Sequence, residues 1–171
     1  MIDGAALDIV PVDPALRLRA ASPIDAAFIR HLFEETRTGQ FIAAGLSGPI
    51  LDQVIAQQFS SQTAGYAAQF PDALSLIVTR NGTANGRLLL HCASERWHIV
   101  DIALLSADCG RGAGTKIIDA LAASARQQGI AALTLTVLAG NVAARRFYLR
   151  HGFIETGRAG DAHIAMRRDL A

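Results

Sequence analysis

The feature that most constrains this chain is a glycine-rich stretch, DCGRGAGTKIIDALAASARQQG, which runs from Asp108 to Gly129. Glycine is the costliest ordinary residue to order, so glycines at the alternate positions 110, 112 and 114 need a structural reason. Apolar residues recur at helical spacing directly after them, and Gly129 is a typical C-terminal stop. The stretch therefore predicts a tight turn into a helix, whose free N–H groups and dipole favour an anion such as a phosphate.

The glycine loop by itself does not identify that anion. It lacks the lysine and hydroxyl order of a P-loop, and it follows most of the chain, whereas a dinucleotide-binding fold places its loop after the first strand. Arg111 and Lys116 add local positive charge. On the glycines alone, a tight turn that holds no ligand is equally compatible with the sequence.

Hydrophobic periodicity along the rest of the chain predicts an α/β domain with a mixed sheet. The expected strands cover residues 16–20, 74–80, 87–93, 96–106, 133–138, 153–157 and 163–170. Helices are expected after Ser22, Pro49, Gly112 and Asn141. The turn NGTANG, between the second and third strands, offers two pairs with positive φ, Asn81-Gly82 and Asn85-Gly86.

Composition narrows the class of protein. With 171 residues, 51% of them hydrophobic and 18% charged, the chain fits one globular domain, expected over 16–171 after an N-terminal arm, 1–15. The net charge of +1 gives no bulk attraction for nucleic acid. No apolar run reaches the roughly 20 residues of a membrane span. The N-terminus does not read as a signal peptide and the chain has two cysteines, so we expect no membrane association, a cytoplasmic location and no metal site.

Two motifs in the second half of the chain resemble the Gcn5-related N-acetyltransferase (GNAT) superfamily. The phosphate loop of that family, Gln/Arg-x-x-Gly-x-Gly/Ala, corresponds to residues 109–114, where Cys109 replaces the usual Gln or Arg. A later motif of the family matches at Asn141, Ala144, Phe147, Tyr148, Gly152 and Phe153. The resemblance implies a GNAT-type mixed, largely antiparallel central sheet flanked by helices, with two central strands that splay apart.

The resemblance also implies acetyl-CoA as the acetyl donor and assigns it a binding route. Backbone N–H groups of the glycine loop would hold the pyrophosphate; the residues are Gly110, Arg111, Gly112, Ala113, Gly114 and Thr115. The pantetheine arm would pair with the strand before the loop, here at Ile102, Leu104 and Leu105, in the gap left by the splayed strands. Asn141 is expected to cap its helix and to offer its amide to the pantetheine.

Tyr148 is the leading catalytic candidate, because a phenol can protonate or stabilise the thiolate that leaves when an amine attacks the thioester. The resembled family places its tyrosine beside the sulfur. For the base that takes the proton of the amine, the sequence offers His98, with a suitable ordinary pKa, and Asp101, an unusual carboxylate in an apolar strand. By strand alternation these two side chains should lie on opposite faces. A water chain without a dedicated base is the remaining alternative.

The expected function is therefore direct transfer of an acetyl group from acetyl-CoA to an amine, borne by a small molecule or a peptide. The acceptor should contact the first two helices, residues 24–70, and the final hairpin. Two alternatives have different ligands or chemistry: a non-catalytic CoA-binding regulatory or interaction module of the same fold, and a nucleotide-binding domain that uses the loop for ATP or a nicotinamide. Since members of the resembled family form dimers, a homodimer is a further expectation.

Overall fold

A single mixed sheet organises the computed structural model, which describes residues 7–170. Its seven strands lie in the order β1-β2-β3-β4-β5-β7-β6, and every neighbouring pair is antiparallel except the parallel pair β4 and β5. The strands are β1 (Leu16–Ala20), β2 (Leu74–Arg80), β3 (Thr83–Cys92), β4 (Arg96–Leu104), β5 (Ala132–Leu138), β6 (Ile154–Ala159) and β7 (His163–Asp169). The predicted fold class is confirmed.

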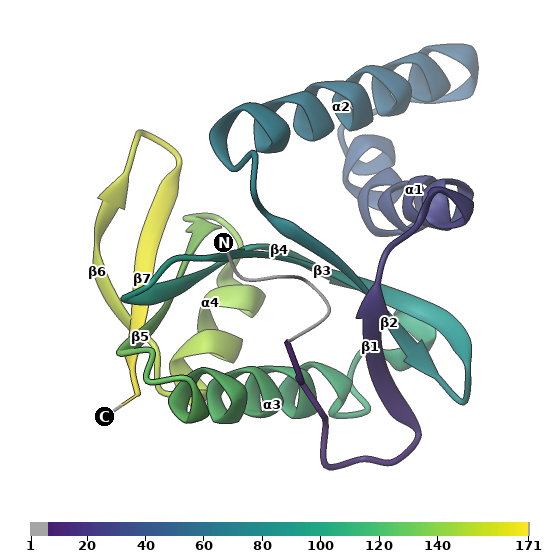
Figure 1. Ribbon diagram of the computed structural model, residues 1–171. Coiled ribbons are helices and arrows are strands. Elements are labelled where there is room, and N and C mark those ends of the chain that lie inside the picture. The colour runs from purple at the N-terminus through teal and green to yellow at the C-terminus, as the bar shows by residue number, and fades with distance from the viewer. Residues whose placement is uncertain (1–6, 171) are drawn as a thin grey trace.

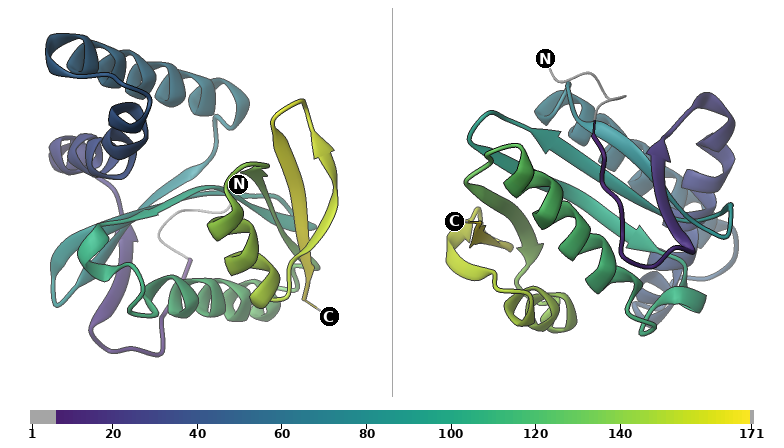
Figure 2. Two further views of the ribbon diagram at one scale, coloured as in Figure 1. Left: turned by 180° about the vertical axis from the view of Figure 1, so that it is seen from behind. Right: turned by 60° about the horizontal axis from the view of Figure 1, so that its bottom comes forward.

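Four α-helices within the described chain cover the two faces of this sheet. They are α1 (Ala26–Ala43), α2 (Gly48–Gln69), α3 (Ala113–Gln127) and α4 (Val142–Arg150). The pair α1 and α2 lies on one face, whereas α3 and α4 lie on the other (Figures 1 and 2). The predicted inward face of α3 is fully buried: Ala113, Ile117, Ile118, Leu121 and Ala125. The main core is therefore on the α3 side of the sheet.

The described part of the N-terminal arm, residues 7–15, packs on this core side. Ile9 is buried among the core residues. Asp13 accepts a hydrogen bond of 2.8 Å from Lys116 Nζ and lies 3.6 Å from Arg80. Lys116, expected from the sequence to add charge near the glycine loop, is thus already paired with a carboxylate. The first six residues of the predicted arm lie outside the described chain.

Of the two Asn-Gly pairs that are predicted to adopt positive φ between β2 and β3, only one does so. Asn81 and Gly82 have φ values of 50° and 81°, as the short hairpin requires. The expectation that Asn85-Gly86 supplies a second positive-φ position is wrong, because both residues lie inside β3. Gly86 is instead required by a close approach of β4: an added Cβ would lie 2.5 Å from Leu104 Cδ2 and 2.7 Å from the Ala103 carbonyl oxygen.

Replacing Gly86 by Ala is therefore expected to destabilise the domain by about 1–3 kcal/mol, the usual cost of overpacking. The Ala103 carbonyl is backbone and cannot rotate away as a side chain can. Gly65→Ala is a matched control, since Gly65 lies in α2 with no atom within 4 Å of an added Cβ. Urea denaturation of both variants measures the difference; equal stabilities would contradict the predicted clash.

The parallel pair β4–β5 is in register only from Arg96–Ile99 to Ala132–Leu135. Beyond this point β4 stays paired with β3, and β5 stays paired with β7. The facing edges of residues 100–104 and 136–138 therefore have no strand partner in the described chain, as expected for splayed central strands. This gap lies directly before the glycine loop.

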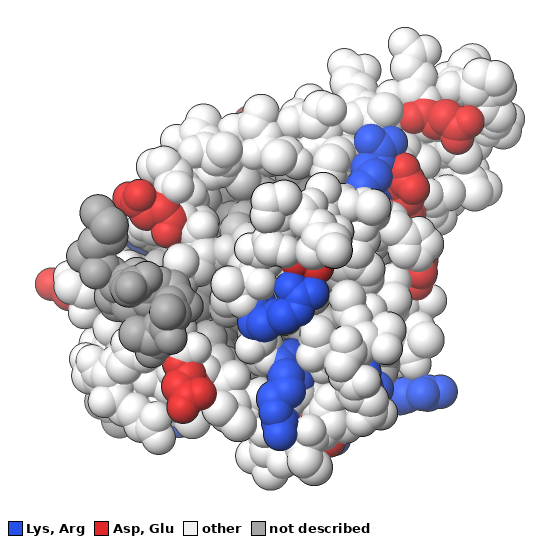
Figure 3. Space-filling model, turned by 45° about the vertical axis from the view of Figure 1, so that its right-hand side comes forward, with Lys and Arg blue, Asp and Glu red and all other residues white. Residues whose placement is uncertain are grey.

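Charges are sparse on α2 and more frequent on α1, which carries Arg30, Glu34, Glu35 and Arg37. Helix α2 has one charged residue, Asp52, in its 22 residues. Figure 3 shows basic and acidic side chains scattered over one face, with mostly uncharged surface between them. No helix in the described chain has the length and apolar character to cross a bilayer.

Candidate active site

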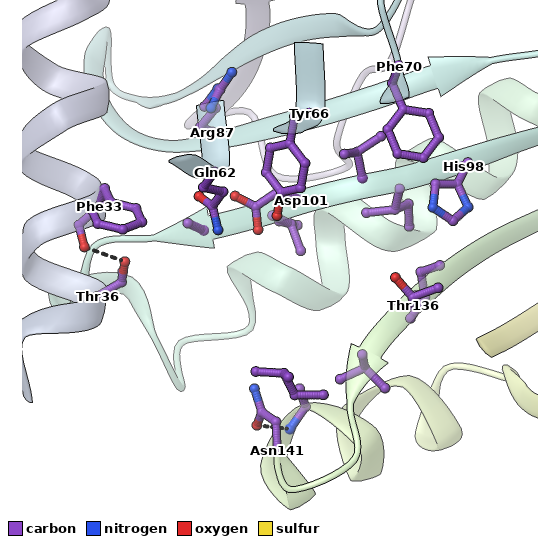
Figure 4. A pocket seen from close by; sticks show the side chains of 18 of the residues that line it. Phe33, Thr36, Gln62, Tyr66, Phe70, Arg87, His98, Asp101, Thr136 and Asn141 are labelled. Carbon is purple, nitrogen blue, oxygen red and sulfur yellow. Dashed lines mark hydrogen bonds between the residues drawn. The ribbon is translucent and has the colours of Figure 1, made fainter. Parts of the chain in front are cut away.

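A cavity of about 1120 Å³ lies between the α1–α2 pair and the splayed ends of β4 and β5. Its lining includes residues of both helices, of β3 and β4, of the end of β5, and of α4 (Figure 4). One end includes Ile102, Leu104 and Asn141, which are expected to bind the pantetheine arm, and also Cys109. The other end is formed by α1 and α2, the helices expected to contact the acceptor. Residues predicted for the pantetheine arm and residues predicted for the acceptor thus line one cavity, whereas residues 110–115 of the glycine loop are not part of its lining.

The glycine loop has the geometry of an anion site. Gly110 and Gly112 have φ values of 77° and 78°, in the left-handed region that favours glycine. The first hydrogen bond of α3 runs from Lys116 N–H to the Gly112 carbonyl at 3.1 Å. The amides of residues 113–115 therefore precede the helical ladder and are directed out of the helix end. Arg111, exposed in the loop, is the nearest cation that has no ion pair within the described residues.

Gly114 has a second role, as the contact point between α3 and α4. An added Cβ there would lie 3.2 Å from Phe147 Cζ, so the two helices approach closely. Thr115 Oγ1 lies 2.9 Å from His151 Nε2, and His151 Nδ1 lies 2.7 Å from the Phe147 carbonyl oxygen. The start of α3 is thus held against α4, and the loop is fixed relative to the rest of the cavity.

The backbone of β4 presents groups without a strand partner to the gap between the splayed strands. The Leu105 N–H donates to the Asn85 carbonyl at 2.8 Å, so the amide of Leu105 is directed toward β3. Because backbone groups alternate sides along a strand, those of Ile102 and Leu104 are directed toward the gap. Of the three residues predicted to meet the pantetheine, the N–H of Leu105 is already used within the sheet. The other two fit a peptide-like arm.

Asn141 caps α4, as predicted. Its Oδ1 accepts a hydrogen bond of 3.1 Å from Ala144 N–H. The side-chain nitrogen is left over and is directed away from the helix, into the cavity (Figure 4). One side chain can therefore cap the helix and donate to a ligand at the same time.

Tyr148 is buried, with 8% of its surface exposed, and it lines the cavity from α4. Its ring packs edge-on against Phe147 and Phe153, with centroids 5.3 Å and 5.4 Å away. Burial, and to a smaller extent the nearby Asp101 carboxylate, raises the pKa of the Tyr148 phenol well above its usual range. The phenol therefore keeps its proton at every physiological pH and is a hydrogen-bond donor.

His98 and Asp101 lie on the same face of β4, and the expectation that they face opposite ways is wrong. A β-bulge is the reason: Leu89 pairs with Asp101 while Leu90 pairs with Ile99, so Val100 is an extra residue. The bulge reverses the alternation, and both side chains line the cavity beneath α2 (Figure 4). A period-two pattern cannot show an inserted residue, so nothing in the sequence indicates this.

The surroundings of His98 make it a weak base. Its ring stacks on Phe70 with centroids 5.2 Å apart, and Nδ1 lies 2.9 Å from Thr134 Oγ1. Burial, together with the charges of His91 and Arg96, lowers the pKa of His98 to about 4. The imidazole is therefore neutral near pH 7, but it binds a proton too weakly to compete with an amine.

The pKa of Asp101 is shifted upward, whereas the pKa of His98 is shifted downward. Burial against the cavity wall raises the pKa of its carboxyl, and the charges of Arg37 and Arg87 only partly offset this. Burial and the Asp101 charge in turn raise the pKa of Tyr66 to about 12. These four side chains form an electrostatic cluster on the acceptor side of the cavity, which we call the Asp101 cluster (Asp101, Tyr66, Arg37 and Arg87).

The sequence interpretation missed Arg87 and left Tyr66 without a role. A signal was present for Arg87, which is a charged residue next to the apolar run LLL within a strand. No such signal marked Tyr66, because its place depends on how α2 lies over the sheet. A further link went unseen: Glu35 of α1 accepts hydrogen bonds of 2.8 Å and 2.7 Å from Ser106 N–H and Oγ. This joins the acceptor-side helix to the segment before the glycine loop.

Comparisons with known proteins agree with this geometry. The model of the Acetyltransferase (GNAT) family matches residues 49–153. No curated protein sequence gives a significant match. Among solved structures, the chain is similar to an acetyltransferase from Thermus thermophilus, with 21% identity, a TM-score of 0.68, and coverage of 91% of this chain and 97% of the other.

Two further structures show the same fold. The PaiA N-acetyltransferase from Thermoplasma acidophilum, in complex with coenzyme A, has 18% identity, a TM-score of 0.66 and coverage of 90% and 98%. A GCN5-related N-acetyltransferase from Rhodopseudomonas palustris has 26% identity, a TM-score of 0.64 and coverage of 90% and 95%. With the family match over most of the chain, the glycine loop and the splayed strands, this chain belongs to the GNAT family and is an acetyl-CoA-dependent N-acetyltransferase.

Proposed function

We propose that the enzyme transfers the acetyl group directly to a primary amine, with Asp101 as the base and Tyr148 as the donor to the leaving sulfur. The observation that carries this proposal is the shared cavity: both side chains line it, between the cofactor-binding end and the acceptor end. The charge of Asp101 also contributes to the raised pKa of the Tyr148 phenol. Base and donor therefore lie close to one reaction centre.

The residues present suit acetyl-CoA, which supplies the activated thioester. Amides of residues 110–115 and the dipole of α3 favour its pyrophosphate. Backbone groups of Ile102 and Leu104 that have no strand partner, together with the amide nitrogen of Asn141, suit the peptide-like pantetheine. Cys109, which replaces the usual Gln or Arg, offers only a thiol, 3.7 Å from the Leu104 carbonyl oxygen. The backbone and Arg111 then supply the polar contacts at the pyrophosphate.

The proposed reaction follows from the protonation states of the two residues. An amine near neutral pH arrives mainly as ammonium, and Asp101 takes one proton from it, aided by its raised pKa. The freed nitrogen lone pair forms the bond to the acetyl carbon. As the carbon–sulfur bond breaks, Tyr148 donates a hydrogen bond to the thiolate, and the second proton lost by the nitrogen ends on sulfur. Products are the N-acetylated amine and the free thiol.

Binding of the cofactor is expected to stabilise the domain strongly. Acetyl-CoA or CoA at about 100 times its Kd adds roughly 2.7 kcal/mol, or about 5–10 °C in Tm for a chain of this length. Thermal denaturation measures the shift, with ATP and NAD at the same concentrations as controls. A shift with ATP or NAD that equals the shift with CoA would contradict the assignment of the glycine loop to CoA.

Three broader expectations complete the proposal. Residues 16–171 act as one acetyltransferase domain behind the N-terminal arm. The enzyme works in the cytoplasm, which suits the free thiols of Cys92 and Cys109. It acts on a small molecule or peptide amine, as a monomer or a homodimer; sedimentation separates the two states.

A further inference from the structure

Two guanidinium groups in the acceptor end of the cavity form no ion pair with any described residue. Arg87 donates from Nε to Ser75 Oγ at 2.9 Å, but within the described chain its two terminal nitrogens have no hydrogen bond or ion pair. Arg37 lies over the ring of Phe33, 5.9 Å from its centroid, and likewise forms no ion pair with any described residue. Both side chains line the cavity.

An unpaired cation that is half-buried is costly. Burial lowers the pKa of Arg87, so its charged form is disfavoured where it lies. Within the cluster, Asp101 is the one carboxylate that faces these two arginines, and the side chain of Arg87 is turned to Ser75 instead. The cluster thus holds one more positive than negative charge. Such an arrangement is complementary to a ligand with an anionic group, and the planar fork of arginine matches a carboxylate.

The position of Arg87 relative to Asp101 limits the size of that ligand. Asp101 pairs with Leu89 and Ala103 pairs with Arg87 across β3 and β4. Arg87 and Asp101 are therefore diagonal neighbours on one face, with backbones about 7–8 Å apart. A small molecule that carries an ammonium and a carboxylate on the same carbon is the simplest ligand that can engage both side chains. Amines that lack a carboxylate would leave Arg87 unpaired.

Three phenylalanines also line the acceptor end, beside polar side chains such as Thr36, Gln62 and Thr63. Phe33 of α1 and Phe59 of α2 pack edge-on with centroids 5.3 Å apart, and Phe70 closes the wall at the end of α2. Gln62 and Tyr66 lie beside Asp101 (Figure 4). The three rings offer apolar surface to a side chain of the ligand, and Asp101 is the one carboxylate among the described residues that line the cavity, so a basic side chain has no second partner there.

We propose, on the basis of the acetyltransferase function above, that the acceptor is a free amino acid with an apolar or aromatic side chain. Arg87 binds its carboxylate, and Asp101 binds its ammonium and then takes the proton. The wall formed by Phe33, Phe59 and Phe70 packs on its side chain. A peptide N-terminus or a protein lysine lacks the neighbouring carboxylate and is a poorer acceptor.

Paired acceptors test this assignment. Release of thiol from acetyl-CoA is measured with phenylalanine, leucine and methionine, each beside its amide, which keeps the amine and side chain but has no carboxylate. Hydrogen bonds to a charged group predict a kcat/KM about 10- to 100-fold higher for the acid. Since the ammonium of the amide is the more acidic, intrinsic reactivity would favour the amide. A preference for the acid therefore has to come from the protein.

The variant Arg87→Met should remove this preference, whereas Arg17→Met, on the exposed edge strand β1 and outside the cavity, should keep it. The Tm and the CoA affinity of each variant show whether it folds. If Arg87→Met does not fold, the ratio of kcat/KM for each amino acid to that for its amide, measured on the unmodified enzyme, still tests the proposal. Equal or better turnover of the amides overturns the amino-acid assignment and leaves the acetyltransferase function intact. Binding of acetyl-CoA without acetylation of any acid also overturns it, and a panel of simple amines and peptides then tests the function separately.

Discussion

Replacing Asp101 by Asn is expected to lower kcat/KM by about 100-fold or more, the usual contribution of a general base. Asparagine keeps the size and polarity of the side chain but has no basic oxygen at neutral pH. Affinity for acetyl-CoA should change little, because the backbone groups that meet the cofactor are unaltered. Steady-state kinetics with the best acceptor, together with CoA binding by calorimetry, measures both quantities.

The same variant should also be more stable than the unmodified protein. This gain distinguishes a buried catalytic base from a carboxylate that stabilises the fold. The raised pKa of Asp101 means that the folded state binds its proton more tightly than the unfolded state does. Such a group costs stability at pH values above its folded pKa, and the cost disappears as the pH falls below its unfolded pKa. Asp101→Asn should therefore melt above the unmodified protein at pH 8, by a margin that shrinks toward pH 4. A lower Tm at pH 8 would contradict this account.

His98→Gln is the matched control for that experiment, since His98 lies on the same face of β4. Its pKa of about 4 leaves it neutral, so glutamine should cost less than about fivefold in kcat/KM. The acid limb of the pH–rate profile should persist in His98→Gln and disappear in Asp101→Asn. A loss with His98→Gln that matches the loss with Asp101→Asn would transfer the role of base to the histidine.

The backbone conformation of the glycine loop and the cap at Asn141 could be predicted from the sequence because they are local. The glycine loop, the start of α3 and the cap at Asn141 depend on backbone conformation within a few residues, and each has a composition that marks it. Their chemistry also uses main chain, so the substitution at Cys109 does not disturb the pattern.

The acceptor end could not be predicted in the same way. It is built from side chains of α1, α2, β3 and β4, which meet only through the tertiary fold. The direction of Asp101 depends on one inserted residue, Val100, which alternation cannot show. Gly86 has the sequence context of a turn residue, although it is fixed by the approach of β4. Long-range contacts thus decide the parts of the site that we propose select the acceptor.

Replacing Tyr148 by Phe should lower kcat by about 100-fold while acetyl-CoA affinity and Tm stay close to those of the unmodified protein. The ring packs against Phe147 and Phe153, and phenylalanine keeps both contacts. The hydroxyl makes no hydrogen bond to another described residue, so its loss leaves no buried partner unsatisfied. What disappears is the donor to the thiolate, a contact that matters as the carbon–sulfur bond breaks.

Because Tyr148 is proposed to act as the carbon–sulfur bond breaks, the loss of kcat in Tyr148→Phe should depend on the acidity of the leaving thiol. A hydrogen bond from the Tyr148 hydroxyl to the leaving sulfur matters most when the departing thiol is weakly acidic. With an acetyl thioester of a more acidic thiol, the loss of kcat in Tyr148→Phe relative to the unmodified enzyme should be smaller than with acetyl-CoA. The loss of kcat in Asp101→Asn should be the same for both thioesters. Thiol release from acetyl-CoA and from an activated aryl thioester of a pantetheine analogue measures this. An equal loss for both donors would mean that Tyr148 orders the cavity and does not assist departure of the sulfur.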